Sequence, residues 1–310
     1  MQLEPRIHRW IEDVALPGRK VTGARPLTGG YSNDNVLVAT ADGDRYVLRR
    51  YLRTNSCAVE AALAGRLAGV VPVAEVIAAD PDSATAGEPV LLSAFVPGRL
   101  LGDVLAGLPD PAAAELGRST GRVLAGIGSV SFAAPGFFSG GALEPGPAGI
   151  EPTEGLDAFV RRCLAEGNAA GHLSDAEQRE LLRFAELSAP GLEVLRGSRR
   201  LVHADFNPKN LLVDRDEDGS WRVTAVLDWE FAFSSAPLFD VGNMLRDPRP
   251  AAFEAGFVDG FRDGGGRLPA DWRRLSRALD LYSLADLLTR PVDHRYFRRA
   301  VERIRDLVAA

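Results

Sequence analysis

The chain has 310 residues, of which 46% are apolar, so it can bury one large core or two smaller ones. Its 42 acidic and 36 basic residues give a formal net charge of −6, which excludes the strong basic field that nucleic acids and anionic lipids require. No apolar stretch is long enough to cross a bilayer. We therefore expect neither a nucleic acid nor a membrane as a partner.

The N-terminal segment and the number of cysteines bear on the cellular compartment of the protein. Glu4, Arg6 and Arg9 interrupt the start of the chain, which lacks the apolar core of a signal peptide. The two cysteines, Cys57 and Cys163, are too few and too far apart in sequence for a disulfide framework. We expect a cytoplasmic protein with two free thiols.

The first part of the chain has the pattern of a small antiparallel sheet with one inserted helix. Apolar residues at helical spacing over residues 4–16 predict an amphipathic helix that ends at a Pro-Gly pair. Residues 20–52 alternate short runs rich in Val, Leu and Tyr with glycine-containing turns, which predicts three strands. Alanine and leucine predict a helix over residues 57–68, and residues 73–79 and 90–95 return to the strand pattern.

Beyond Pro97-Gly98 the pattern becomes mainly helical. Helical spacing covers residues 111–127 and 156–169, and it returns from residue 251 onward. Residues 131–155 are rich in Gly and Pro, which predicts a loop. Short apolar runs predict three further strands, of which the last two are joined by an Asp-Gly turn: residues 201–204, 211–214 and 222–227.

The densest group of polar residues follows the strand predicted at residues 201–204. The run Leu-Val-His-Ala-Asp-Phe-Asn-Pro-Lys-Asn contains His203, Asp205 and Asn210, and the next hairpin ends in an Asp-Trp-Glu run that begins at Asp228. An Asp after a short strand can accept the proton of a substrate hydroxyl, and an Asn and a second Asp can hold Mg²⁺ through hard oxygen ligands. We therefore expect Asp205 to be catalytic and Asn210 and Asp228 to be metal ligands.

These motifs resemble those of the aminoglycoside phosphotransferase family, whose members have a kinase-like fold. The family's catalytic loop reads His-x-Asp-x-x-Pro-x-Asn, which His203, Asp205, Pro208 and Asn210 match, and many members have Asp-Trp-Glu at the metal aspartate, as at Asp228. Protein kinases instead have Asp-Phe-Gly and a later Ala-Pro-Glu, and the sequence contains neither. A protein kinase with a regulated activation loop is therefore disfavoured.

The resemblance extends to the first part of the chain. Gly29, Gly30 and Ser32 lie where the family has its phosphate-covering loop, in which glycines let the backbone approach a triphosphate. Arg49 lies where kinase-like enzymes place a phosphate-binding lysine, and Glu60 lies where the partner glutamate belongs. Arginine in place of lysine is the main departure, because the two cations are not equivalent donors.

Three further positions follow from the same resemblance. Residues 92–98 resemble the linker between two lobes, so backbone groups of Ala94 and Val96 are expected to recognise the nucleotide base. Asp240 lies in a Pro-x-x-Asp segment like the one that the family carries after its metal aspartate. Glu230 is expected either to contact the metal or substrate or to brace the loop.

The resemblance implies an α+β, bilobal, protein-kinase-like fold. Residues 1–96 would form an N-terminal nucleotide-binding lobe with a small antiparallel β-sheet and one key helix. Residues 97–310 would form a larger, mainly α-helical C-terminal lobe with the catalytic loop and the substrate cleft.

The implied activity is Mg²⁺-dependent transfer of the γ-phosphate of ATP or GTP to a hydroxyl group of a small molecule, and an aminoglycoside or other hydroxylated antibiotic is the expected acceptor. A metabolic kinase for a sugar, an amino alcohol or a nucleoside is the alternative, since residues 251–310 carry more bases than acids and offer no acidic tail to a polycation. A nucleotide-binding pseudokinase, in which Arg49 marks lost transfer activity, is a third hypothesis.

Three other kinds of site fail on sequence grounds. Neither Lys20 nor Lys209 is followed by Ser or Thr, which excludes a Walker A loop. Two distant cysteines and the absence of a His-Glu-x-x-His run exclude the common zinc motifs. Residues 214–219 begin like a calcium-binding EF-hand loop, but Ala225 replaces its bidentate glutamate, so we interpret the segment as an acidic hairpin turn.

Overall fold

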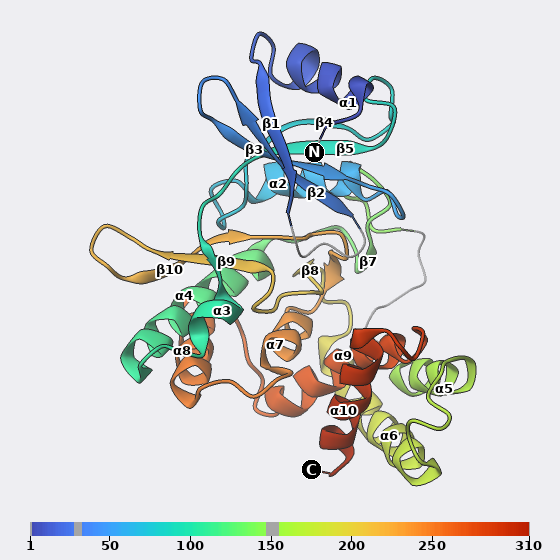
Figure 1. Cartoon of the computed structure of the whole chain (residues 1–310). Coiled ribbons are helices and arrows are strands. Elements are labelled where there is room, and N and C mark those ends of the chain that lie inside the picture. Colours follow the sequence, from blue (N-terminus) through green and yellow to red (C-terminus); the bar gives the residue numbers. More distant parts are fainter. Residues whose placement is uncertain (1, 28–32, 147–154, 310) are drawn as a thin grey trace. The chain divides into compact units, whose positions relative to one another are not determined.

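The computed structural model describes residues 2–27, 33–146 and 155–309, which form two compact units (Figure 1). The chain enters each unit more than once. Unit 1 comprises Met1–Leu105, Phe138–Glu144 and Lys209–Phe231, and unit 2 comprises Ala106–Phe137, Pro145–Pro208 and Ala232–Ala310. The predicted boundary between two lobes, at residues 96 and 97, stays a prediction. The first segment of compact unit 1 ends at Leu105.

An antiparallel sheet of five strands, in the order β1-β2-β3-β5-β4, forms the main part of unit 1. The three strands predicted over residues 20–52 are confirmed as a meander. Gly43, in the turn between β2 and β3, has a φ of +88°, which glycine adopts without a steric cost. The elements are α1 (Pro5–Trp10), a π-helical turn (Ile11–Ala15), β1 (Val21–Pro26), β2 (Asp34–Thr40), β3 (Arg45–Arg50), α2 (Cys57–Leu67), β4 (Val76–Asp80) and β5 (Val90–Ala94).

The two faces of this sheet carry different chemistry because side chains alternate along a strand. Tyr46 and Leu48 of β3 belong to an apolar cluster that includes residues of α1. Leu91 of β5 has the opposite parity to Leu92 and packs in a second cluster with residues of α2. Arg49 alternates with Leu48 and therefore faces the α2 side of the sheet.

A second sheet, in the order β10-β9-β6, also belongs to unit 1. The hairpin of β9 (Leu211–Arg215) and β10 (Trp221–Val226) confirms the two strands predicted there. The backbone N–H of Ser220 donates to side chains of its acidic turn, so the hairpin interpretation is confirmed. The sequence did not predict β6 (Arg99–Leu100), which precedes α3 (Leu101–Leu105), because two residues show no periodicity.

Unit 2 is mainly helical and contains a short sheet in the order β7-β11-β8. The helix predicted over residues 111–127 is confirmed, and the helix predicted over residues 156–169 ends earlier, at Glu166. A two-residue strand lies inside the segment predicted as a loop, residues 131–155, of which residues 147–154 are outside the described part. The elements are α4 (Asp110–Ser129), β7 (Gly136–Phe137), α5 (Leu156–Glu166), α6 (Asp175–Ser188), a 3₁₀ helix (Ala189–Leu195), β8 (Arg200–Val202), β11 (Phe233–Ser235), α7 (Leu238–Leu245), α8 (Ala251–Asp263), α9 (Trp272–Leu287) and α10 (Arg295–Ala309).

Antiparallel sheets together with a helical C-terminal part confirm the predicted α+β class. Within the described ranges, no helix combines the length and apolar character needed to cross a membrane.

Helices α4 and α8 approach closely because glycines line both sides of their contact. A Cβ atom placed on Gly121 of α4 would lie 2.1 Å from a backbone carbonyl oxygen of α8. One placed on Gly260 of α8 would lie 2.2 Å from a carbonyl oxygen of α4, and Gly117 and Gly256 are confined in the same way. Since α4 also contacts β8, this packing supports the strand that leads into the loop at residue 203.

We expect Gly121→Ala to lower the free energy of unfolding by about 1–3 kcal/mol, because the added methyl group overpacks the helix contact. Gly65→Ala is the matched control, since Gly65 lies in helix α2 with no atom within 4 Å of the new Cβ. That control should be neutral or stabilising by up to about 1 kcal/mol. Urea unfolding measures both, and wild-type stability in Gly121→Ala would contradict the close packing.

Candidate functional site

Arg49 lies among three carboxylates in unit 1. Its Nη2 atom is 2.6 Å from Asp228 Oδ1 and 3.5 Å from Glu230 Oε2, and its Nε atom is 3.4 Å from Glu60 Oε2. Strand β3 supplies the arginine, α2 supplies Glu60, and the segment after β10 supplies the other two. The fold thus joins Arg49 to a carboxylate that lies 179 positions later in the sequence.

Burial and charge act against each other in this cluster. Burial disfavours the Arg49 cation, but Glu60 and Asp228 outweigh it and raise the arginine pKa above its usual value. Burial also raises the pKa of Glu60 to about 7, although Arg49 and a hydrogen bond from Ser56 act in the other direction. Arg49 therefore stays charged, while Glu60 takes up a proton more readily than an exposed glutamate does.

Two buried polar side chains that the sequence analysis did not single out hold the carboxylates in place. Ser56 Oγ donates to Glu60 Oε1 at 2.7 Å, and Asn33 Nδ2 donates to Glu230 Oε2 at 2.8 Å. Serine before a helix predicts a cap, but nothing in the sequence indicates that the residue before β2 contacts the segment after β10.

The two predicted metal ligands lie at one end of the β9–β10 hairpin. Val226 pairs with Leu211, and the Leu227 N–H donates to the Asn210 carbonyl at 2.8 Å, so Asn210 and Asp228 flank the end of this ladder. Asp228 has a φ of +67°, a conformation that is uncommon outside glycine and concentrated at functional sites.

The chemistry of this donor pair fits Mg²⁺. One carboxylate and one amide oxygen suit a cation that takes its remaining ligands from water and phosphate. Across the described part of the chain, no group of three or more His, Cys, Asp and Glu side chains is arranged to hold a metal on its own. A metal at Asn210 and Asp228 would therefore depend on oxygen ligands from elsewhere.

Asp205 lies in unit 2, in the loop that follows β8. Its Oδ1 atom accepts a hydrogen bond from Asn207 Nδ2 at 2.7 Å, and the same nitrogen donates to Asn243 Oδ1 of α7 at 3.0 Å. Asn243 is buried, so its position is fixed by the helix. Asn207 therefore connects the Asp205 carboxylate to α7, a role that the sequence analysis did not identify.

Asp240 anchors the backbone of the same loop. Its carboxylate is fully buried and accepts hydrogen bonds from the N–H groups of His203, at 2.7 Å, and Ala204, at 2.8 Å. Ala204 has a φ of +67°, and the His203 ring accepts a hydrogen bond from the Asp205 N–H at 3.2 Å. Burial raises the pKa of Asp240 to about 7, against the effect of the two backbone donors. This aspartate fixes the backbone conformation on the N-terminal side of Asp205.

The predicted nucleotide-binding residues are only partly within the described chain. Gly29, Gly30 and Ser32 lie outside the described residues. Ala94 is the last residue of β5, and its N–H donates to the Glu75 carbonyl at 2.8 Å. The Ala94 backbone group that we expect to contact the base is therefore its carbonyl. Val96 follows the strand. Base recognition by Ala94 and Val96 stays a prediction.

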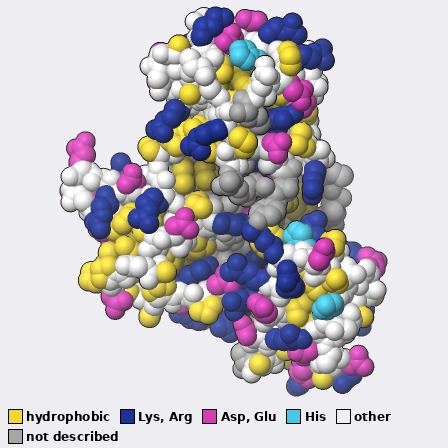
Figure 2. Space-filling model, in the orientation of Figure 1, with side chains coloured by type: hydrophobic (Ala, Val, Ile, Leu, Met, Phe, Trp, Pro, Cys, Tyr) yellow, Lys and Arg dark blue, Asp and Glu magenta, His cyan; other side chains and the backbone are white. Residues whose placement is uncertain are grey.

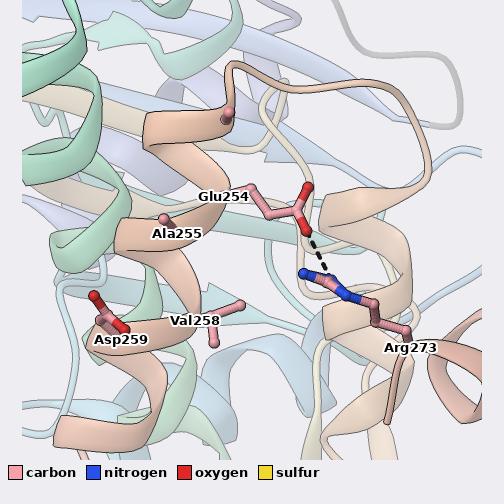
Figure 3. A pocket seen from close by; sticks show the side chains of 6 residues that line it. Glu254, Ala255, Val258, Asp259 and Arg273 are labelled. Atoms are coloured by element: carbon pink, nitrogen blue, oxygen red, sulfur yellow. Dashed lines mark hydrogen bonds and ion pairs between the residues drawn. The ribbon is translucent and has the colours of Figure 1, made fainter. Parts of the chain in front are cut away.

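A hollow of about 320 Å³ in unit 2 lies on other elements (Figure 3). Glu254 of α8 and Arg273 of α9 point toward each other there, with 2.8 Å between Oε1 and Nη1. None of the predicted site residues within the described ranges lines it. Its lining residues are Ala251, Glu254, Ala255, Val258, Asp259 and Arg273.

Comparison with known proteins places this geometry in a family. The model of the phosphotransferase enzyme family matches residues 23–277. No curated protein matches the chain. Solved structures with a similar fold include a thermostable mutant of an aminoglycoside phosphotransferase with ADP and hygromycin B (TM-score 0.67, 20% identity, 94% of each chain covered).

Two other similar structures cover almost the whole chain. A macrolide 2′-phosphotransferase from Brachybacterium faecium has a TM-score of 0.67 at 20% identity and covers 97% of this chain and 98% of its own. The GDP and kanamycin complex of an APH(2″) has a TM-score of 0.73 at 19% identity and covers 95% of this chain and 96% of its own. At this identity the likeness concerns the fold.

The buried Asp240 predicts a pH dependence of stability. Its pKa is about 7 in the folded chain and near the ordinary 3.8 in the unfolded chain, so folding takes up a proton between these values and the free energy of unfolding falls as the pH rises. Asp240→Asn should make this decline shallower by the contribution of Asp240, while the contribution of Glu60, whose pKa is also raised, remains. Because an amide oxygen replaces only one of two acceptors, the substitution should also lower stability by about 1–3 kcal/mol. Urea unfolding between about pH 4 and pH 7 measures both effects.

The exposed Asp259→Asn on α8 is the control for this measurement, and it should keep the wild-type pH profile. A wild-type profile in Asp240→Asn would contradict the raised pKa.

Proposed function

Because the chain belongs to the phosphotransferase enzyme family, we propose that it transfers the γ-phosphate of ATP or GTP to a hydroxyl group of a small molecule in an Mg²⁺-dependent reaction. The observation that supports this most is the position of Arg49 between Glu60 and Asp228. A kinase-like site needs a phosphate-binding cation, a glutamate that orients it, and a metal-binding aspartate, and these three come from distant parts of the chain.

Asp205 is the proposed catalytic residue. Its carboxylate, oriented by Asn207, orients the acceptor hydroxyl and takes its proton as the hydroxyl oxygen forms a bond to the γ-phosphorus. The bond from the γ-phosphorus to the bridging oxygen breaks, and its electron pair leaves with the nucleoside diphosphate. The backbone hydrogen bonds to Asp240 keep this loop in place during the reaction.

The nucleotide site is proposed in unit 1. Arg49, oriented by Glu60, binds phosphate oxygens and offsets their charge. Asn210 and Asp228 hold Mg²⁺, which when bound neutralises further phosphate charge. The residues proposed from the sequence to cover the phosphates and recognise the base are Gly29, Gly30, Ser32, Ala94 and Val96.

An aminoglycoside or other hydroxylated antibiotic is the acceptor class that we propose first. Two of the similar structures are complexes with hygromycin B and kanamycin, and a third is a macrolide phosphotransferase. One fold can carry many acceptor specificities, so the acceptor must be tested directly. The cytoplasmic location expected from the sequence stays a prediction.

A metabolic acceptor such as a sugar, an amino alcohol or a nucleoside is the second candidate, and local charge favours it. Arg249, Arg299 and Arg303 share the carboxylate of Asp247. Figure 2 shows Lys and Arg side chains, interspersed with carboxylates, on the part of the surface where Figure 1 draws α9 and α10. This basic group in unit 2 would repel a polycationic acceptor.

The proposed function is tested by nucleoside diphosphate release with ATP or GTP and Mg²⁺ across aminoglycosides, macrolides, sugars, amino alcohols and nucleosides. We expect Asp205→Ala to lower kcat by about 10²–10⁴-fold while nucleotide affinity stays unchanged, because the carboxylate acts on the acceptor hydroxyl. Asp214→Ala, an exposed carboxylate of the β9–β10 hairpin, is the matched control and should keep wild-type turnover. Normal turnover in Asp205→Ala would refute the assignment.

Asn207→Ala tests how Asp205 is oriented. Loss of the bridge to Asn243 lets the carboxylate leave its productive orientation, so we expect kcat to fall about tenfold or more with little change in nucleotide affinity. Asn168→Ala, an asparagine whose exposed side chain caps a carbonyl elsewhere in unit 2, is the control. An equal loss in both variants would mean that Asn207 acts only through general stability.

A further inference from the structure

The guanidinium of Arg49 lies within ion-pair distance of three carboxylates and donates a hydrogen bond to one of them, Asp228. Its shortest contact is Nη2 to Asp228 Oδ1 at 2.6 Å, a charge-assisted hydrogen bond. The same nitrogen lies 3.5 Å from Glu230, and Nε lies 3.4 Å from Glu60. With only 12% of its side chain exposed, the guanidinium is held in this position from three sides.

Arg49 and Asp228 therefore engage each other although the proposed function gives them different ligands. While Arg49 Nη2 lies 2.6 Å from Asp228 Oδ1, the guanidinium takes up space and one acceptor site at the oxygen that Mg²⁺ would approach to its usual distance of about 2.0–2.1 Å. A guanidinium next to Asp228 also repels a divalent cation electrostatically. Both effects weaken metal binding at Asp228 as long as Arg49 stays beside it.

We propose that the Arg49 guanidinium occupies the place beside the Asp228 carboxylate where a metal would bind, until nucleotide phosphates draw it away. This proposal rests on the proposed function. The metal site would then be completed only when a nucleotide is bound. Phosphate oxygens are suited to this exchange because they accept the same forked pair of N–H groups as a carboxylate.

The hydrogen bonds of the other two carboxylates keep the free-energy cost of this exchange low. Glu60 keeps its hydrogen bond from Ser56, and Glu230 keeps its hydrogen bond from Asn33, when the guanidinium turns. The Asp228 side chain is 31% exposed, against 9% for each of the two glutamates, so it is the carboxylate that water or a metal can reach. Arg49 can thus keep its contact with Glu60 while it exchanges Asp228 for phosphate.

The arginine itself, rather than its charge alone, carries this effect. A guanidinium has five N–H donors in a planar fork and can contact Glu60 and Asp228 at once, whereas a lysine has one compact ammonium that spans less space. In Arg49→Lys the ammonium would stay with the more deeply buried Glu60 and leave Asp228 to the metal. The substitution keeps the positive charge, so it separates the hydrogen-bonded competition from simple repulsion.

The first experiment measures Mn²⁺ binding without nucleotide by the electron paramagnetic resonance signal of free Mn²⁺. We expect Arg49→Lys to bind Mn²⁺ at least about fivefold more tightly than wild type. Arg50→Lys is the matched control, since Arg50 is the next residue of β3 and pairs with Glu88 on the other side of the strand, and it should keep the wild-type constant. Adding Asp228→Asn to Arg49→Lys should abolish the gain.

An unchanged dissociation constant for Mn²⁺ in Arg49→Lys would overturn the proposal that Arg49 competes with the metal. A gain that persists after Asp228→Asn would also overturn it, because the metal would then bind elsewhere. Urea unfolding of each variant verifies that it is folded at the temperature of the measurement.

A second experiment measures binding of a fluorescent ATP analogue in the presence of a chelator. Asp228→Asn should tighten metal-free nucleotide binding in the wild-type background, because Arg49 is released, and by clearly less in the Arg49→Lys background. Equal gains in both backgrounds would overturn the proposal, since removal of a negative charge helps both equally. Neither experiment depends on phosphate transfer, so failure of the proposed function would appear separately as absent diphosphate release.

Discussion

The buried guanidinium of Arg49 is the constraint on which much of unit 1 depends. Removing a cation from water costs several kcal/mol unless carboxylates and hydrogen bonds replace the solvent. Here β3 carries the cation, α2 carries Glu60, and the end of β10 carries Asp228. Each element must be in place before the charge is satisfied, so the ion pairs specify where α2 and the hairpin meet the five-stranded sheet.

Helix α7 plays the corresponding part in unit 2. Asp240 and Asn243 are three residues apart, which puts them on one face of the helix. The first fixes the loop backbone through two N–H groups, and the second reaches the Asp205 carboxylate through Asn207. Arg246, at the end of the same helix, pairs with Asp280 of α9 at 2.6 Å and so ties α7 to the helical core.

The sequence predicts those strands, helices and motifs of this molecule that depend on residues close together in the chain. Alternation and turns predict the strands at residues 20–52, and the spacing of His203, Asp205 and Asn210 predicts a kinase-like loop. The sequence does not show that Arg49 contacts Asp228, because the two residues are 179 positions apart and meet only in the folded chain.

The bridge through Asn207 escaped prediction for a related reason. An asparagine two residues after an aspartate is most simply a turn residue, and its second partner, Asn243, is defined only once α7 has packed. Short strands such as β6 and β7 also lack a sequence signal, since two residues cannot show a period. Local chemistry is therefore predictable here, while its long-range partners are not.

The way in which the chain returns to unit 1 also bears on how the protein is made. Domains tend to fold from the N-terminus during synthesis. All five strands of the first sheet have been synthesised once Ala94 is added, but Asp228 and Glu230 belong to the last segment of unit 1, Lys209–Phe231. Until the ribosome has produced that segment, Glu60 is the only carboxylate of this cluster that is available to Arg49. The late segment therefore completes the charge balance of the first sheet as well as its own hairpin.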